Sequence, residues 1–290
     1  MKAKSSKRLL NNVIFAGLLA MSAHNVAALT VKPTLELWGT EAFSADCNPT
    51  SCGSQSGFSL TSTTANFHKL RADNTLSNAG NAVEGHALMT ASTGLTLPQL
   101  TAKASGPLLA EGIASAIGTY SYSGPNVTKI LNATLSGSIL NPNNSPLTNI
   151  KVGVAIFDAL TLESAVTSTT PGAGFQELAA AASSLAFGKT VKLSRGTPKP
   201  LKTLLLTLTA TGTKSGSIAL SLVKGESFYI VTSLLVEAGK GGTADALHTF
   251  KLSFNNNSGL VSPNSVPVPS SIWLFGSSAL GALSLKRRRV

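Results

Sequence analysis

Apolar and polar residues alternate along several segments of the C-terminal half, and this alternation is the strongest constraint on the fold. In residues 202–210, leucines at every second position fall on one face of an extended chain, and threonines fall on the other. The same period of two recurs in residues 216–223, 227–236 and 247–254, with glycine-containing turns between the segments. This series predicts strands of an antiparallel meander or sandwich.

The upstream half shows the same strand-like alternation of apolar and polar residues, with one exception. Further strands are predicted in residues 57–64, 66–70, 88–97, 114–122, 127–140 and 149–160. Residues 175–187 are instead rich in alanine and carry apolar residues at helical spacing, which predicts one short helix across an end of the sandwich. We therefore expect an all-β fold, a jelly-roll-like antiparallel β-sandwich with one short helix.

The first 28 residues have the organisation of a secretory signal peptide. Four basic residues precede an apolar run, and Val26-Ala27-Ala28 offers small residues for cleavage. Residues 29–265 then form the exported body. Its only cysteines, Cys47 and Cys52, flank a short turn-rich segment, and in an oxidising compartment we expect them to form a disulfide. A metal-binding or redox pair is the alternative, although neither a nearby histidine nor a second cysteine pair accompanies them.

The formal net charge of +11 suggests a polyanionic partner, but its distribution removes this suggestion. Four of the 23 basic residues lie in the signal peptide and four at the C-terminus. The body keeps 15 basic and 12 acidic residues, a net charge of +3. The remaining charge orients the two ends of the chain, so we expect no nucleic-acid partner.

Motifs for catalysis are weak in the body. The three body histidines, His68, His86 and His248, do not fall at metal-ligand spacing with other ligands, and no nucleophile elbow is present. Gly188-Lys189-Thr190 resembles the end of a phosphate-binding loop, but its expected upstream glycine is Ser183. We expect no cofactor, no metal site and no enzymatic activity; a secreted hydrolase is the least favoured reading.

A sugar-binding site is the main alternative to a purely structural role. Trp38 is the only tryptophan of the body, and Tyr120 and Tyr122 are two residues apart, so they share one face of a strand. Together these three side chains are a candidate aromatic platform for a glycan. Packing of the same aromatics into the sandwich core is the competing interpretation.

The C-terminal 25 residues, 266–290, have three parts in a fixed order. A proline-broken stub is followed by about sixteen mostly apolar or small residues and then by a basic cluster. Sixteen residues at 1.5 Å each span about 24 Å, which is short for a hydrocarbon core of about 30 Å. The pattern predicts a short transmembrane segment with its basic end in the cytoplasm, a transient tether more than a permanent anchor.

This ending resembles a PEP-CTERM sorting signal, in the variant group that reads Val-Pro-Leu-Pro-Ala-Ala followed by Trp-Leu-Phe-Gly-Ser. The residues that carry the resemblance are Val266, Pro267, Val268, Pro269, Trp273, Phe275, Gly276, Arg287, Arg288 and Arg289. Val268 departs from the glutamate of the name-giving motif, which favours the variant processing system. The match covers about 25 of the 290 residues.

The resemblance implies a Gram-negative bacterium that makes exopolysaccharide, and processing by an exosortase-type enzyme. The expected partners are this enzyme, the inner membrane transiently, and exopolysaccharide. We therefore expect a non-catalytic protein of the cell surface or biofilm matrix, exported by its signal peptide and tethered before processing. The alternative is a carbohydrate-binding module or adhesin with a defined glycan site.

Overall fold

The computed structural model describes residues 39–47, 52–60, 69–78, 81–92, 95–166, 173–247 and 250–262. The chain divides into two compact units, residues 1–32 and 33–290, and every described residue belongs to the second unit. The signal peptide, Trp38, His68, His248 and the residues of the sorting signal lie outside the described residues. The expectations for them stay predictions.

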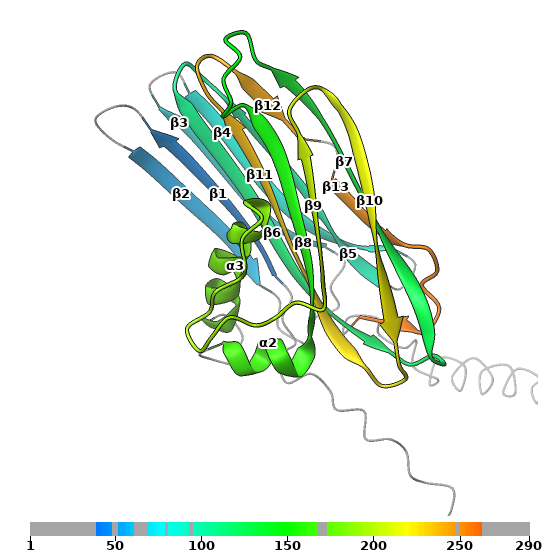
Figure 1. Cartoon of the computed structure of the whole chain (residues 1–290). Helices are drawn as coiled ribbons and strands as arrows, with labels where there is room; N and C mark the ends of the chain where they lie inside the picture. Colours follow the sequence, from blue (N-terminus) through cyan, green and yellow to red (C-terminus); the bar gives the residue numbers. More distant parts are fainter. Residues whose placement is uncertain are drawn as a thin grey trace, which may run out of the picture. The chain divides into compact units, whose positions relative to one another are not determined.

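Two antiparallel sheets make up most of the described chain (Figure 1). The first, named the helix-covered sheet, has the order β2-β1-β6-β11-β8-β9, with β14 paired to β6. Its strands are β1 (Gly39–Cys47), β2 (Cys52–Leu60), β6 (Leu109–Tyr122), β8 (Asn149–Asp158), β9 (Lys202–Leu208), β11 (Ser227–Ala238) and β14 (Leu260–Val261).

The second sheet, named the open sheet, has the order β10-β7-β12-β5-β4-β3, and β13 pairs with both β5 and β7. Its strands are β3 (Lys69–Asn78), β4 (Asn81–Ser92), β5 (Leu95–Ser105), β7 (Val127–Leu140), β10 (Gly212–Leu222), β12 (Thr243–Asp245) and β13 (Phe250–Phe254). The two sheets pack face to face, so the predicted all-β antiparallel sandwich is confirmed at this level.

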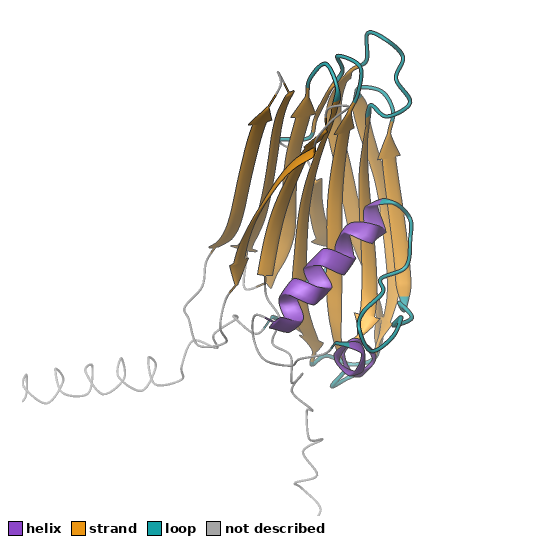
Figure 2. Cartoon of the chain, turned by 90° about the vertical axis from the view of Figure 1, so that its left-hand side faces the viewer, coloured by secondary structure: helices purple, strands orange, loops and turns teal. Residues whose placement is uncertain are grey.

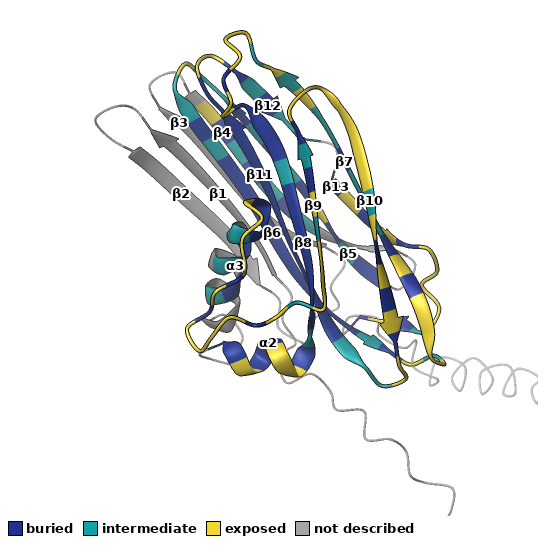
Figure 3. Cartoon of the chain, in the orientation of Figure 1, coloured by how far each residue is buried: buried dark blue, intermediate teal, exposed yellow. Residues whose placement is uncertain are grey.

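The main apolar core lies between the sheets and follows from the alternation seen in the sequence. Inward residues of β7, β10 and β13 are buried at every second position, while their neighbours are exposed or half-buried (Figure 3). Between the sheets, near the end of β6 and the start of β11, the rings of Tyr120 and Phe228 stack with their centroids 5.6 Å apart. This core buries Tyr120, Phe228 and Phe250 almost completely.

Two helices cover the outer face of the helix-covered sheet (Figure 2). The longer one, α3 (Ala173–Ala186), matches the predicted helix, but it lies along the sheet and does not cross an end. Its Leu178, Ala182 and Leu185 complete a second apolar cluster with residues of β8 and β11. Burial of this apolar stripe on an already apolar sheet face explains its position.

The other helix, α2 (Ala159–Ala165), was not predicted, because residues 149–160 were expected to form one strand. Asp158 ends β8 and caps α2, since its Oδ1 accepts a hydrogen bond of 2.9 Å from the backbone N of Thr161. The prediction of a single helix was therefore wrong. No helix among the described residues is long and apolar enough to cross a membrane.

Of the two arrangements expected for the strands of residues 202–254, a meander or a sandwich, the structure has the sandwich. The strands β9, β10, β11 and β13 do not pair with one another; β9 and β11 belong to the helix-covered sheet, and β10 and β13 belong to the open sheet. Short turns permit this because β9 and β10 lie at neighbouring edges of the two sheets. The strand predicted at residues 88–97 is in fact the end of β4 and the start of β5, and both strands belong to the sandwich.

Candidate functional site

The outer face of the open sheet carries regular rows of polar side chains. Strands β4, β5, β7 and β10 turn their apolar residues to the core, so the intervening polar residues project outward. No described helix lies on this face, in contrast to the opposite sheet. An uncovered sheet face with many hydrogen-bonding groups is the candidate functional surface of the described chain.

Hydroxyl and amide groups form the rows on β7 and β10. The hydroxyl of Thr213 donates to that of Ser136 over 2.9 Å, and the hydroxyls of Thr134 and Ser215 are 3.3 Å apart. Asn132 continues the pattern, with Ser217 as its partner on one side in the strand register and Ser253 on the other. Cross-strand pairing thus fixes the spacing of these groups on a rigid support.

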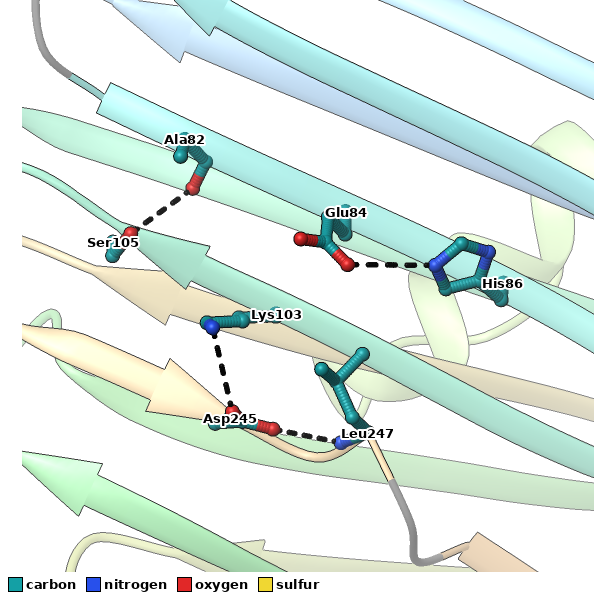
Figure 4. A network of polar contacts seen from close by, with 7 residues as sticks. All are labelled: Ala82, Glu84, His86, Lys103, Ser105, Asp245 and Leu247. Atoms are coloured by element: carbon teal, nitrogen blue, oxygen red, sulfur yellow. Dashed lines mark hydrogen bonds and ion pairs between the residues drawn. The ribbon is translucent and has the colours of Figure 1, made fainter.

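A charged row crosses β4, β5 and β12 (Figure 4). Glu84, Lys103 and Asp245 are successive partners in the register, and Lys103 Nζ lies 3.7 Å from Asp245 Oδ2. The other carboxylate oxygen of Asp245 accepts a hydrogen bond of 2.9 Å from the backbone N of Leu247. These two contacts hold the Asp245 carboxylate in place, and the strand register sets Asp245 opposite Ser138 of β7.

The same region contains His86, one of the three histidines of the body. It lies in β4, half-buried, with Nε2 at 3.6 Å from Glu84 Oε2. Within the described part of the chain, no group of three or more histidine, cysteine or acidic residues is arranged to hold a metal ion.

A groove of about 440 Å³ lies where the polar rows and the charged row meet. It exists because β12 ends at Asp245, opposite Ser138, whereas β13 starts at Phe250, opposite Leu135, so the ladder beside β7 is interrupted between them. The lining residues are Ser136, Gly137, Ser138, Thr211, Gly212, Thr213, Asp245 and Leu247. Hydroxyl groups, one carboxylate and exposed backbone are suited to a polyhydroxyl ligand without net charge.

The tyrosines of the predicted aromatic platform do not reach this surface, and this part of the prediction was wrong. Tyr120 is 0% exposed and Tyr122 is 3% exposed, because both face the core between the sheets. The hydroxyl of Tyr120 donates to the carbonyl of Thr96 over 2.7 Å, and that of Tyr122 donates to the carbonyl of Pro125 over 2.7 Å. Burial raises the pKa of Tyr120 well above its ordinary value.

The two cysteines fall at the ends of the β1–β2 hairpin, where the register pairs Cys47 with Cys52. Directly opposed residues of an antiparallel pair have Cα atoms about 4.5–5.5 Å apart, a separation that a disulfide requires. The backbone is therefore compatible with the expected disulfide, which stays a prediction.

A pair of carboxylates that sequence reasoning missed lies on the helix-covered sheet. Glu111 of β6 and Glu237 of β11 are direct partners in the register, and Lys151 Nζ lies 3.0 Å from Glu237 Oε2. Partial burial, followed by repulsion from Glu237, raises the pKa of Glu111, while Lys151 opposes the shift.

We expect Glu111→Gln to stabilise the protein at neutral pH. The pKa of Glu111 is raised in the folded state, so its ionised carboxylate destabilises the fold at pH values above that pKa. Below the ordinary pKa of a glutamate in the unfolded chain, the carboxyl is protonated in both states and this cost disappears. The expected gain is about 0.5 kcal/mol in the free energy of unfolding at pH 7, the size of a like-charge cross-strand pair. Urea unfolding at pH 7 and pH 4 measures it, and the gain should vanish at pH 4.

The matched variant is Glu237→Gln, which removes the ion-pair partner of Lys151 and should give no such gain. A gain for Glu111→Gln that persists unchanged at pH 4 would mean that packing, not charge, is responsible.

Neither a known protein family nor a curated protein matches the chain. Among solved structures, TmCBM61 in complex with beta-1,4-galactotriose is 9% identical, with 64% of this chain and 86% of that chain covered and a TM-score of 0.25. The enzymatically active domain of tailspike protein 4 of Bacteriophage CBA120 is 7% identical, with 65% of this chain and 20% of that chain covered and a TM-score of 0.24. Similarity at this level carries no argument about fold or function.

Proposed function

We propose that this protein is a non-catalytic adhesion protein that contacts neutral polysaccharide through the outer face of its open sheet. The observation that carries the proposal is the set of hydroxyl and amide rows on β7 and β10, which end in the groove beside Asp245. Sugars present hydroxyl groups that both donate and accept hydrogen bonds, and serine, threonine and asparagine side chains complement both roles.

The affinity for one sugar unit would be low. A single neutral hydrogen bond contributes about 0.5–1.5 kcal/mol net, and the described residues that line the groove include no aromatic side chain. Three or four such bonds correspond to a dissociation constant in the millimolar range. A polysaccharide repeats the same unit, so many weak contacts along one polymer raise the overall retention.

The strand framework favours such contacts despite their weakness. Ser136, Ser138 and Thr213 are fixed by the pairing of β7 with β10 and β12, so little conformational entropy remains to be lost on binding. If the same side chains lay on a mobile loop, the entropy cost of ordering that loop would cancel much of the binding free energy.

The location of the protein is the second part of the proposal. The signal-peptide pattern of residues 1–28 supports export, and the resemblance of residues 266–290 to a PEP-CTERM signal supports a transient membrane tether. An exosortase-type enzyme would then process the chain, leaving the body at the cell surface or in an exopolysaccharide-rich matrix. The intact mass of released protein tests this part: it should lack the apolar span, and a complete C-terminus would contradict processing.

The binding part is tested with an array of neutral oligosaccharides and polysaccharides. The triple variant Ser136→Ala, Ser138→Ala, Thr213→Val removes three hydroxyls of the groove with little change in side-chain size. We expect at least about a tenfold loss of binding, which corresponds to about 0.5 kcal/mol for each hydroxyl.

The matched control carries the same kinds of change at exposed hydroxyls outside the open sheet, Ser164→Ala, Ser194→Ala and Thr197→Val. Binding that is absent from all neutral glycans at millimolar concentration, or lost equally in both triple variants, would refute this role of the open sheet.

A further inference from the structure

The segment that connects α3 to β9 concentrates positive charge. Residues 188–202, which end at the first residue of β9, contain Lys189, Lys192, Arg195, Lys199 and Lys202 and no acidic residue. These five residues, named the cation strip, are a third of the 15 basic residues of the body. All five are exposed. The small net charge of the whole body conceals this local excess.

The connector is held against the body although it has little regular structure. It runs down alongside α3 before it enters β9 (Figure 2). Val191 and Leu193 are buried in the apolar cluster beneath α3, and Pro198 is buried as well. Because buried apolar residues alternate with exposed basic ones, the segment presents its cations outward from a fixed path.

Backbone hydrogen bonds fix the same path. Leu193 and Gly196 exchange two hydrogen bonds of 2.8 and 3.0 Å in a tight turn, and the N of Arg195 donates to the carbonyl of Ala165 over 3.2 Å. The N of Leu201 donates to the carbonyl of Ile156 over 2.7 Å. The cation strip is therefore displayed on an ordered support.

The charges of the strip are not used within the described fold. Among the described residues, the ion pairs involve other lysines and a histidine, not the five strip residues. Nearby acids are already engaged: Asp158 caps α2, Glu163 accepts a hydrogen bond from the Tyr229 hydroxyl, and Glu177 accepts one from the Ser194 backbone N. Within the described part of the chain, Lys189 alone of the five has an aromatic ring beside it, with its Nζ 5.6 Å from the ring centroid of Phe187.

We propose that the cation strip binds an anionic polysaccharide, a linear polymer that carries carboxylates at regular intervals. The basic residues recur every three or four positions along an ordered segment, so five exposed cations are gathered on one short stretch of chain, which suits a polymer that can bring several carboxylates to one place. One exposed aromatic residue offers little stacking for the bases of a nucleic acid. Single exposed ion pairs are weak, so several must act together, and their sum must fall as salt screens them.

This inference goes beyond the proposed function, because the strip borders the helix-covered sheet and the neutral-sugar rows lie on the open sheet. If both surfaces bind, one molecule can join a neutral and an acidic polymer. Each surface can fail without the other, because the ligands and the variants that test them differ.

Co-sedimentation of the full protein with polygalacturonate, at 50 mM and 500 mM NaCl, tests the strip. The triple variant Lys192→Gln, Lys199→Gln, Lys202→Gln should bind about tenfold more weakly than the unaltered protein at 50 mM NaCl, and binding of the unaltered protein should be lost at 500 mM NaCl. The control Lys214→Gln, Lys224→Gln, Lys240→Gln removes the same charge from exposed sites outside the strip and should stay within twofold. Equal weakening in both variants would overturn the proposal, since net charge alone would then explain binding.

Vesicles of phosphatidylglycerol and duplex DNA serve as competing polyanions. Strip-dependent binding to either one, without binding to polygalacturonate, would overturn the proposal in favour of that ligand. Retention of neutral-glycan binding by the strip variant would show that the protein is folded and that the two surfaces act separately. Salt-resistant binding of the unaltered protein would equally contradict an electrostatic strip.

Discussion

Tyr120→Ala is expected to lower the free energy of unfolding by about 3–5 kcal/mol, the largest effect of any substitution considered for this protein. The side chain is completely buried between the sheets, where its ring stacks on Phe228 and its hydroxyl donates to the carbonyl of Thr96. Alanine would leave a cavity with the volume of an aromatic ring. It would also remove the hydrogen bond that the hydroxyl donates to the carbonyl of Thr96. This loss is a large part of the roughly 5–15 kcal/mol by which an ordinary domain is stable.

Urea unfolding followed by circular dichroism measures this loss. Tyr120→Phe keeps the ring and removes only the hydroxyl, so it should cost about 1–2 kcal/mol. Leu140→Ala is the surface control, because Leu140 is 63% exposed, and its expected effect is within about 0.5 kcal/mol. A small loss for Tyr120→Ala would contradict the burial of this tyrosine and would reopen its role in a glycan platform.

Gly153→Ala should have the second-largest effect, about 2 kcal/mol. A Cβ atom at Gly153 would lie 2.4 Å from the carbonyl carbon and oxygen of Leu185 in α3. Because the obstacle is backbone, a rotamer change cannot relieve it, and α3 must move away from β8. The displacement would weaken the packing of Leu178, Ala182 and Leu185 on the sheet.

Denaturant unfolding gives the size of this effect, and limited proteolysis of the connector after α3 gives its location. Gly216→Ala is the control, because its Cβ would lie 2.9 Å from Leu204 Cδ1, at the end of a flexible side chain that can rotate away. We expect less than about 1 kcal/mol for this control. Unchanged proteolysis in Gly153→Ala would show that α3 does not depend on a close approach to β8.

The strands and the helix α3 could be predicted because their patterns are local. Alternation in residues 127–140 coincides with β7, and the alanine-rich run coincides with α3 within two residues at its start. The helix α2 escaped prediction because its start depends on one capping residue, Asp158, after a continuous apolar strand. Propensity alone does not locate such a boundary.

The pairing of strands could not be predicted, since it depends on contacts between distant residues. The strands β9, β10 and β11 follow one another in the sequence but alternate between the two sheets, and β11 lies between β6 and β8. The same limit applies to the candidate groove, which requires β7, β10 and β12 to meet. Alternation assigned Tyr120 and Tyr122 to one face, but not to the inner face of the sandwich.

The net charge of the body likewise gave no indication of the cation strip. A body charge of +3 argued against polyanion binding, yet five basic residues lie within the 15 residues 188–202. What the total could not show is that buried Val191 and Leu193 hold this connector in place and direct its cations to solvent. Local charge density, not net charge, is the relevant quantity for such a surface.

The central claim is that the open sheet contacts neutral polysaccharide, and a residue-resolved titration tests it most directly. Amide chemical shifts of isotope-labelled protein would be recorded with increasing amounts of a neutral oligosaccharide retained on the array. The account predicts millimolar binding, with the shifts concentrated at Ser136, Ser138, Thr213 and Asp245. Shifts concentrated on the helix-covered sheet, or none at saturating sugar, would contradict it.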